Sequence, residues 1–280
     1  MMKYRYYFYP FLTLLCCFVI RCSASLLDWF SFDRNGRSLE SEIVTCNIPA
    51  NGTVTIHSPL CYVKAIIKVN DSLSIQGRGN TTTHTTIVKH TTFHGTIFSI
   101  SKGNSLQLNN FHLIGKYSNN NNNNNNNNRD NLLIEGNGGS IVVEGLNARL
   151  VLINCIIADH FAIGLPPYGY GGAIFVHDFA VAYMENVTFK TNYAENEGGA
   201  IYGKKNSIIH INNSHFVENV AGFSGGSIAV VDNVDIDVIN SYIRNSSANY
   251  QGGGVFISNS ARLSKPVNHG KIVRLGRILL

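Results

Sequence analysis

The sequence predicts an all-β solenoid, in which short coils of chain stack on one another and each strand pairs with its equivalent in the next coil. Three observations support this prediction. A Gly-Gly pair recurs at a nearly constant spacing, and apolar and polar residues alternate in the segments between the pairs. None of these segments is long enough to form a helix with an apolar stripe of its own.

The glycine pair opens each repeat, and successive pairs are separated by 33, 27, 27 and 27 residues. Each pair runs into a short apolar segment with β-propensity, as in GGAIFV and GGAIYG. We expect the glycines to permit a tight turn into the first strand of a coil, where a positive φ or a close approach between coils excludes a side chain. A phosphate-binding loop is excluded because neither G-x-x-x-x-G-K-[ST] nor G-x-G-x-x-G occurs there. The pairs are Gly138–Gly139, Gly171–Gly172, Gly198–Gly199, Gly225–Gly226 and Gly252–Gly253.

A second strand in each repeat ends in an asparagine. The positions two and four residues before the asparagine are apolar and those between are mostly polar, which is typical of a strand with one buried face. By this alternation the asparagine faces inward, where a buried amide must be hydrogen-bonded. We therefore expect an inward ladder in which each amide bonds to the backbone and to the asparagine of the next coil. Its members are Asn154, Asn186, Asn213 and Asn240.

A third short strand follows the asparagine turn. An isoleucine or phenylalanine stands three residues after the asparagine and an alanine eight residues after it. Each coil therefore consists of a strand, a turn, a second strand, an asparagine turn, a short strand and a loop. The markers are Ile157, Phe189, Phe216 and Ile243, followed by Ala162, Ala194, Ala221 and Ala248.

Residues 1–24 read as a secretory signal peptide, with Lys3 and Arg5 before an apolar run and small residues that allow cleavage after Ala24. The apolar run is shorter than the ~20 residues of a spanning helix. The other interpretation is a signal anchor that stays in the membrane. No later segment is apolar enough to span, so the mature chain has no predicted transmembrane segment. Residues 25–65 are expected to form an N-terminal cap region before the solenoid.

Charge, cysteines and sequons fit a secreted or cell-surface protein. Residues 25–261 contain 14 basic and 17 acidic residues, a net charge of −3, which excludes a nucleic acid partner. Cys46 and Cys61 are predicted to form a disulfide, and Cys155 to be a buried thiol. The Asn186 sequon is expected to stay unmodified because it faces inward. Glycosylation is expected at Asn51, Asn70, Asn80, Asn212 and Asn245.

Several of these elements together resemble a known family. INCIIADHFA, GGAIFV and ENVTFKTNYAENEGGAIY look like the right-handed parallel β-helix of the pectin-lyase-like superfamily. Within it, the F-x-x-N elements FKTN and FVEN, followed by GGAI or GGSI, resemble polymorphic outer membrane protein repeats. The resemblance covers residues 66–263 and implies coils of ~27 residues. It implies no single activity, because the fold hosts polysaccharide lyases, glycoside hydrolases, adhesins and passive surface proteins.

Two segments depart from the repeat. A run of asparagines at 119–128 predicts a low-complexity loop, residues 118–130, that leaves the stack. Residues 264–280 form an atypical basic tail, which is either a cap over the last coil or an incomplete end.

The resemblance to pectate lyases implies an acidic calcium cluster with an Arg or Lys base, and the hydrolases imply paired aspartates. The candidates on the first strand and its loops contain no Asp-Asp or Asp-x-Asp group. We therefore predict no catalytic residue, no metal and no cofactor. These candidates are Glu144, His177, Asp178, Glu195, Glu197, Lys204 and Lys205.

Binding is the remaining possibility on the first strand. Alternation places Phe175, His177, Tyr202 and Lys204 on one side, and if that side is outward they form an aromatic strip for an extended glycan. The other interpretation is that these aromatics lie under loops or only cover the strand. His210 and Asp237 fall on an outer face one coil apart and are predicted to be a solvated pair rather than a catalytic dyad.

The sequence thus predicts a secreted or cell-surface β-helical protein of adhesion, coat or matrix type without catalytic activity. Its expected partner is an extracellular polysaccharide or a cell-surface or matrix protein. The alternative is a polysaccharide lyase or glycoside hydrolase, whose acidic residues would converge from loops.

Overall fold

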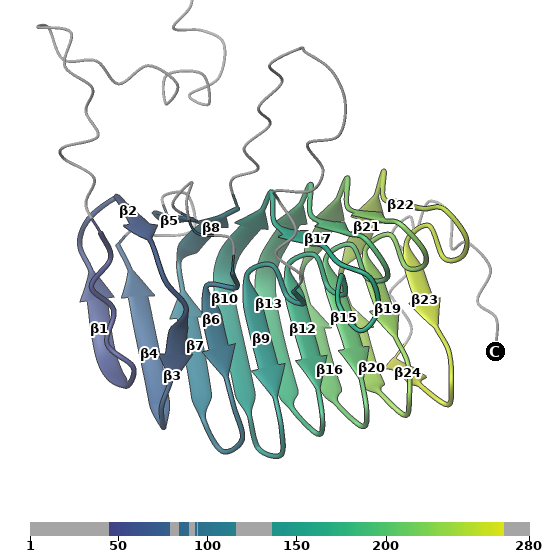
Figure 1. The fold of residues 1–280 in the computed structure, drawn as a ribbon, viewed down its shortest axis with the longest axis horizontal. Coiled ribbons are helices and arrows are strands. Elements are labelled where there is room, and N and C mark those ends of the chain that lie inside the picture. Colours follow the sequence, from purple (N-terminus) through teal and green to yellow (C-terminus); the bar gives the residue numbers. More distant parts are fainter. Residues whose placement is uncertain (1–44, 79–83, 90–92, 94, 116–135, 266–280) are drawn as a thin grey trace, which may run out of the picture. The chain divides into compact units, whose positions relative to one another are not determined.

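The computed structural model describes residues 45–78, 84–89, 93, 95–115 and 136–265, which belong to one compact unit, Val44–Leu280. Every regular element among them is a β-strand, and the strands stack side by side along the chain (Figure 1). The predicted signal peptide, residues 118–130 and residues 266–280 lie outside the described residues.

The strands form three parallel sheets around a common core, as expected for an all-β parallel solenoid. The longest sheet has thirteen strands, and we call it the long sheet. Its main path runs through β1 (Gly52–Ile56), β4 (Ser72–Gly77), β7 (Ser105–Asn109), β10 (Arg149–Ala158), β13 (Val181–Lys190), β16 (Ile208–Asn212), β20 (Asp235–Ile239) and β24 (Arg262–Lys265). Strands β10 and β13 continue through a corner into a second row, made of β2 (Leu60–Val63), β5 (Thr85–Lys89), β8 (Phe111–Ile114), β17 (His215–Val217) and β21 (Tyr242–Arg244).

The remaining strands form two further sheets. The seven-stranded sheet contains the strands that follow the glycine pairs, and directly paired residues in its last four strands are 27 residues apart, as in Ile174, Ile201 and Ile228. Its strands are β3 (Ile67–Val69), β6 (Phe98–Ile100), β9 (Ile141–Glu144), β12 (Ile174–His177), β15 (Ile201–Lys204), β19 (Ile228–Val230) and β23 (Val255–Ile257). The short sheet holds β11 (Phe161–Ala162), β14 (Tyr193–Ala194), β18 (Val220–Ala221) and β22 (Ser247–Ala248).

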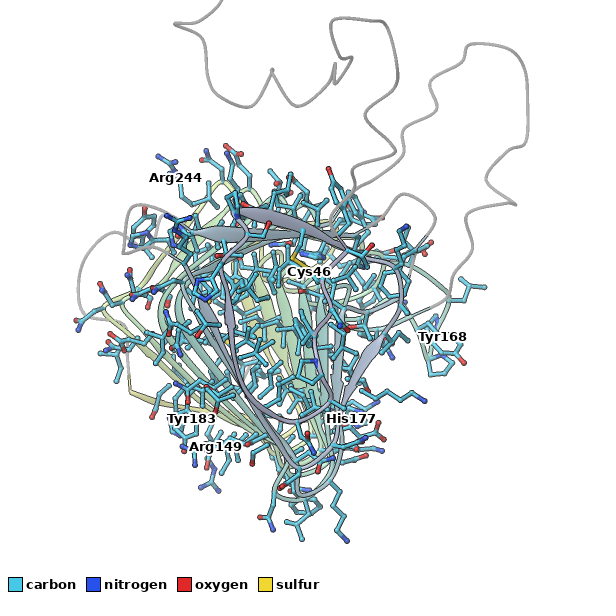
Figure 2. All side chains as sticks on the ribbon, turned by 90° about the vertical axis from the view of Figure 1, so that its left-hand side faces the viewer. Cys46, Arg149, Tyr168, His177, Tyr183 and Arg244 are labelled. Carbon is cyan, nitrogen blue, oxygen red and sulfur yellow. A yellow bond between two sulfur atoms is a disulfide. The ribbon has the colours of Figure 1, made fainter. Side chains whose placement is uncertain are left out.

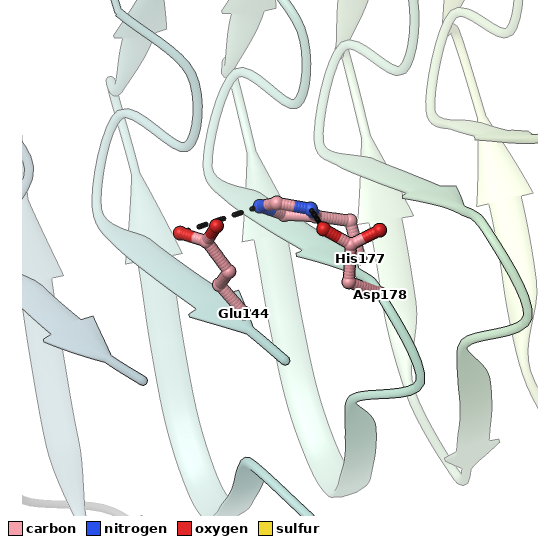
Figure 3. Close-up of side chains that lie close together, drawn as sticks. All are labelled: Glu144, His177 and Asp178. Carbon is pink, nitrogen blue, oxygen red and sulfur yellow. Dashed lines mark hydrogen bonds and ion pairs between the residues drawn. The ribbon is translucent and has the colours of Figure 1, made fainter. Parts of the chain in front are cut away.

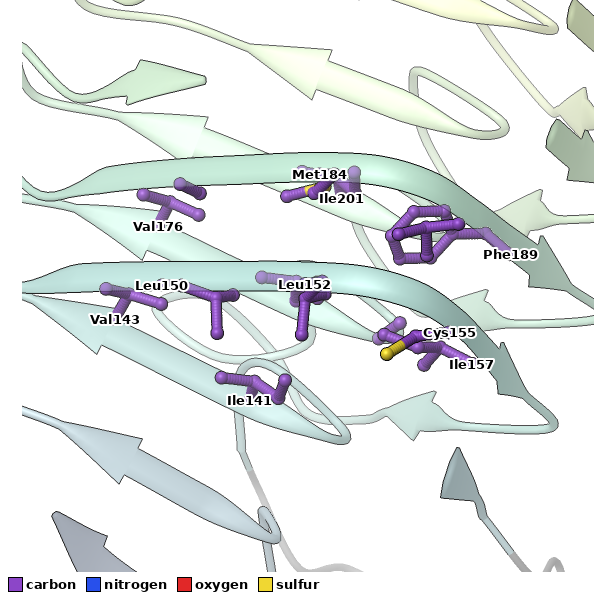
Figure 4. Packing of buried hydrophobic residues seen from close by; sticks show 14 of the residues in the cluster. Ile141, Val143, Leu150, Leu152, Cys155, Ile157, Val176, Met184, Phe189 and Ile201 are labelled. Atoms are coloured by element: carbon purple, nitrogen blue, oxygen red, sulfur yellow. The ribbon is translucent and has the colours of Figure 1, made fainter. Parts of the chain in front are cut away.

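Apolar side chains from the long and seven-stranded sheets fill the space between them (Figure 4). Phe189 and Phe216, the markers of two successive coils, stack with ring centroids 4.8 Å apart and are fully buried. Cys155 is a buried free thiol as predicted, and burial raises its pKa to about 12. Equivalent positions thus pack on one another from coil to coil.

The glycine pair satisfies both of its predicted requirements, one at each residue. Gly198 has φ +69°, which strains any residue with a side chain. A Cβ on Gly199 would clash with the carbonyl oxygen of Gly226 in the next coil. Backbone conformation and the close contact between coils therefore require glycine at both positions of the pair.

The corner asparagines differ from the inward ladder that the sequence predicts. Asn154, Asn186, Asn213 and Asn240 have φ between +48° and +54°, and this left-handed turn breaks the alternation of the strand. Asn213 and Asn240 are consequently exposed. Asn186 does donate a hydrogen bond to Asn154 Oδ1 at 2.8 Å, while Asn240 donates to Asn212 at 3.5 Å.

A buried column of amides lies instead at the asparagine of the F-x-x-N element. Asn192 and Asn219 are fully buried and follow Phe189 and Phe216 by three residues. Asn192 donates to the carbonyl of Ile157, and Asn219 donates to that of Phe189. These amides satisfy backbone groups that would otherwise be buried without partners.

A disulfide bond joins Cys46 and Cys61, the pair predicted from the sequence, with Cα atoms 5.2 Å apart. It connects the segment before β1 to β2, which belongs to the second row of the long sheet. The first described coil is therefore closed covalently.

Candidate functional site

The predicted aromatic strip is covered. Phe175 and Tyr202 lie in adjacent strands with parallel rings 5.6 Å apart, but each is only 5% exposed. Tyr170, from the loop before β12, lies over Tyr202 at 4.6 Å between ring centroids. The expectation of an open glycan surface at these two rings is wrong, and the interpretation that places the aromatics under a loop agrees with the structure. The rings pack with Val142, Ala229, Val231 and Phe256 in a small cluster separate from the main core.

A carboxylate closes the same cluster. The Tyr202 hydroxyl donates to Glu197, a half-buried acid from the loop before β15. Burial and the neighbouring Glu197 raise the pKa of Tyr202, and burial also raises the pKa of Glu197. This hydrogen bond holds the loop before β15 on the sheet. Lys204 is half-buried at the end of β15, directly opposite His177.

His177 lies between two carboxylates at the ends of β9 and β12 (Figure 3). Its Nε2 is 3.7 Å from Glu144 Oε2 and its Nδ1 is 3.0 Å from Asp178 Oδ2. Desolvation lowers the pKa of His177 despite both acids. For Asp178, His177 and Lys205 together outweigh the effect of burial, and the pKa is lowered. The histidine therefore sits in a polar network and not on a flat binding strip.

The three side chains of this network could offer one ligand atom each to a cation, since these atoms lie within 4.8 Å of one another. Lys205 Nζ forms an ion pair with Asp178 Oδ1 at 3.3 Å, and its positive charge opposes the binding of a cation there. All three residues are candidates in the sequence analysis, which does not predict that they lie together. The available signal is that Glu144 and His177 stand at the same position of successive repeats, GGSIVVE and GGAIFVH.

A second candidate site lies on the outer face of the long sheet, which faces a different side from His177 in an end-on view (Figure 2). Here a groove of about 290 Å³ crosses β10, β13, β16 and β20. We call it the outer groove. Its side chains form two rows in register across the coils. One row is Val151, Tyr183, His210 and Asp237, and the other is Ile153, Glu185, Asn212 and Ile239.

The first row combines aromatic and charged groups. The rings of Tyr183 and His210 stack with centroids 4.8 Å apart. The guanidinium carbon of Arg149 lies 4.7 Å from the centroid of the Tyr183 ring, so the stack also makes a cation–π contact. His210 Nδ1 is 3.0 Å from Asp237 Oδ2, with side-chain exposures of 39% and 15%. The predicted His210–Asp237 pair therefore exists, but as part of a longer arrangement.

The second row and Asp237 of the first row supply further hydrogen-bonding groups. Asn212 Nδ2 donates to Glu185 Oε2 at 2.8 Å, and Glu185 is otherwise exposed. Asp237 Oδ1 is buried and has no hydrogen-bond partner among the residues that the structure describes. The sequence analysis did not single out Tyr183, Arg149 or Glu185. Strand alternation already places Tyr183 at the repeat position of His210, and this signal could have found it.

The sequons differ in accessibility. Asn51, Asn70 and Asn245 are exposed, which suits the predicted glycosylation, while Asn80 lies outside the described residues. The amides of Asn186 and Asn212 are both engaged, with Asn154 and Glu185 respectively. Modification of Asn212 would thus have to break its bond to Glu185 in the outer groove.

None of the described segments forms a helix that is long and apolar enough to cross a membrane. Comparison with protein-family models, curated proteins and solved structures finds no match to this chain.

Proposed function

We propose that the chain is a right-handed parallel β-helix of the pectin-lyase-like type with coils of 27 residues. The pairing of residues 27 apart in β12, β15 and β19 supports the coil length. The handedness is supported by a general rule, since crossover connections between parallel strands of one sheet are right-handed in ~98% of cases. We further propose that the protein is a secreted or cell-surface scaffold of adhesion, coat or matrix type.

The proposed activity of the scaffold is binding of an extended extracellular glycan along the outer groove. The observation that carries this proposal is the stack of Tyr183 and His210 beside two carboxylates. Aromatic faces pack against the apolar face of a sugar ring, while carboxylates, amides and imidazoles bond its hydroxyl groups. Glu185, Asn212 and Asp237 provide such groups next to the stack.

The direction of the groove favours an extended chain over a compact ligand. Equivalent side chains repeat from coil to coil at the strand spacing of ~4.8 Å, perpendicular to the strands. A polymer lying along the stack of coils can contact successive strands with successive units. A groove of this shape also suits a passive scaffold, because binding along it requires no closing loop.

A glycan array with the purified protein tests this proposal, followed by titration of the oligosaccharides that bind. Tyr183→Ala should reduce binding at least tenfold. Tyr242→Ala is the matched control, because Tyr242 stacks on His215 at 4.0 Å elsewhere on the same sheet and is 37% exposed. Equal loss in both variants, or no glycan bound by the wild type, would contradict the proposal.

The alternative function is that of a polysaccharide lyase or glycoside hydrolase. The hydrogen-bonded His210–Asp237 pair on the groove favours it, because a histidine oriented by a carboxylate can act as a general base. Incubation with polyuronides, with and without calcium, and with neutral polysaccharides measures unsaturated products and new reducing ends. Product formation that is lost in His210→Ala would replace the scaffold proposal with the enzymatic one.

A further inference from the structure

The charges of the outer groove indicate which glycans it can hold. Its lining contains two carboxylates, Glu185 and Asp237, and among the described lining residues neither a lysine nor an arginine. Arg149 lies on the Tyr183 ring, beside the groove rather than in its lining. A negatively charged polymer in the groove would be repelled by both acids.

Asp237 offers a specific acceptor. Its Oδ2 accepts from His210 Nδ1 at 3.0 Å, whereas its Oδ1 is buried and lacks a partner among the described residues. A carboxylate oxygen has two acceptor positions, and the Asp237 side chain is 15% exposed, so a donor in the groove can bond Oδ2 beside its bond to His210 while Oδ1 stays buried. The bond from His210 holds the carboxylate in a fixed position at the groove.

Glu185 is a second acceptor in the neighbouring row. Asn212 bonds its Oε2, and its exposed side chain can turn the other oxygen toward a ligand. Glu185 and Asp237 stand on β13 and β20, on either side of the strand that carries His210. Two acceptors along the direction of the stack therefore flank the aromatic platform.

We propose that the outer groove selects glycans that carry free amino groups, with the ammonium groups bound by Asp237 and Glu185 and the sugar rings on Tyr183 and His210. This inference rests on the proposed glycan binding. An ammonium group has three donors and bonds a carboxylate more strongly than a hydroxyl does. Relative to an N-acetylated glycan, the gain in affinity should be about tenfold for one such bond.

Isothermal titration with three oligosaccharides of equal length tests the selectivity: a β-1,4-linked glucosamine oligomer, its fully N-acetylated form and an oligogalacturonate. The buffer is held below the pKa of the sugar amines. The wild type should bind the amine-bearing oligomer about tenfold more tightly than the acetylated one, and the oligogalacturonate most weakly. Added salt should weaken only the first interaction strongly.

Variants distinguish selectivity for amino groups from glycan binding itself. Asp237→Asn and the exposed Glu185→Gln should each reduce the affinity for the amine-bearing oligomer more than that for the acetylated oligomer, so that the tenfold preference is lost. Asp235→Asn, an exposed acid of the same strand outside the groove lining, is the control and should change neither. Glu185→Gln keeps the test decisive if Asp237→Asn fails to fold.

Two results would overturn the inference. If the acetylated oligomer or the oligogalacturonate binds as tightly as the amine-bearing one, and Tyr183→Ala abolishes that binding, the selectivity is wrong and glycan binding stands. If none of the three oligomers binds and the glycan array is also negative, the proposed function fails as well.

Discussion

The side-chain amide of Asn192 donates a hydrogen bond to Oδ1 of Asn219, one coil further along, at 3.0 Å, and both residues are fully buried. The column continues at both ends. The backbone N–H of His160 donates to Asn192 Oδ1, and that of Asn219 donates to Ser246 Oγ. Side chains at one repeat position thus connect four successive coils through the interior.

Asn219→Ala should destabilise the protein by about 2 kcal/mol or more, because it leaves the buried N–H of Asn192 and the carbonyl of Phe189 without their partners. Urea denaturation followed by circular dichroism measures the free energy of unfolding. Asn213→Gly is the control, since Asn213 is an exposed corner residue and glycine retains its positive φ. Similar losses in both variants would contradict a special role for the buried column.

These asparagines show how far the sequence predicts the fold. Spacing alone predicts the stacking of coils and the pairing of their strands, because both depend on period. Alternation fails at the corners, where a residue with φ near +50° turns two successive side chains outward, as at Ile153 and Asn154. The buried amides of the F-x-x-N elements lie beyond that corner, so counting alternation through it assigned the wrong asparagine to the interior.

The candidate site was less predictable than the fold. Alternation correctly placed His210 and Asp237 on an outer face, but it could not show which outer face a loop would cover. Tyr170 stands directly before its glycine pair, and its packing on Tyr202 covers the predicted strip. The residue at this repeat position differs from coil to coil, as Tyr170, Glu197, Ser224 and Gln251 show, so the repeat did not indicate an aromatic ring over the strip.

The second glycine of each pair provides a test of coil-to-coil contact. Gly199→Ala should destabilise by roughly 1–3 kcal/mol, because the new Cβ would clash with the Gly226 carbonyl of the next coil. Gly253→Ala is the matched control in the last described coil, where, among the described residues, a Cβ would meet only the Ser246 carbonyl oxygen at 3.6 Å. Thermal denaturation should show a large loss for the first and little change for the second. A tolerated Gly199→Ala would mean that the coils can separate at this position without loss.

Reduction of the Cys46–Cys61 disulfide should lower the free energy of unfolding by about 3 kcal/mol, since it closes a loop of 15 residues in the unfolded chain. Guanidinium denaturation with and without a phosphine reductant measures this difference. The double variant Cys46→Ser, Cys61→Ser should match the reduced wild type and respond no further to the reductant. Cys155→Ala should retain the full response, because that thiol is free and buried. A response lost in Cys155→Ala would show that another thiol is involved.

His160 should make the fold sensitive to acid. Burial lowers its pKa well below the ordinary value, and the neighbouring Lys89 and His112 act in the same direction. In the unfolded chain it binds a proton below a pH of about 6.5, so the unfolded state then carries more protons than the folded state. The stability is therefore complete above that pH and falls as the pH decreases, by at most about 1.4 kcal/mol per pH unit for this residue.

His160→Asn isolates this contribution, because asparagine occupies the equivalent position in the next two coils, at Asn192 and Asn219. Denaturant midpoints at about pH 7.5 and about pH 5 should differ less for this variant than for the wild type. Replacement of the exposed His57 by asparagine should leave the wild-type pH dependence intact. Parallel pH profiles for the wild type and His160→Asn would contradict this prediction, because they would show that the folded protein accommodates the protonated imidazole. The full burial of His160 and the nearby charges of Lys89 and His112 argue against that outcome.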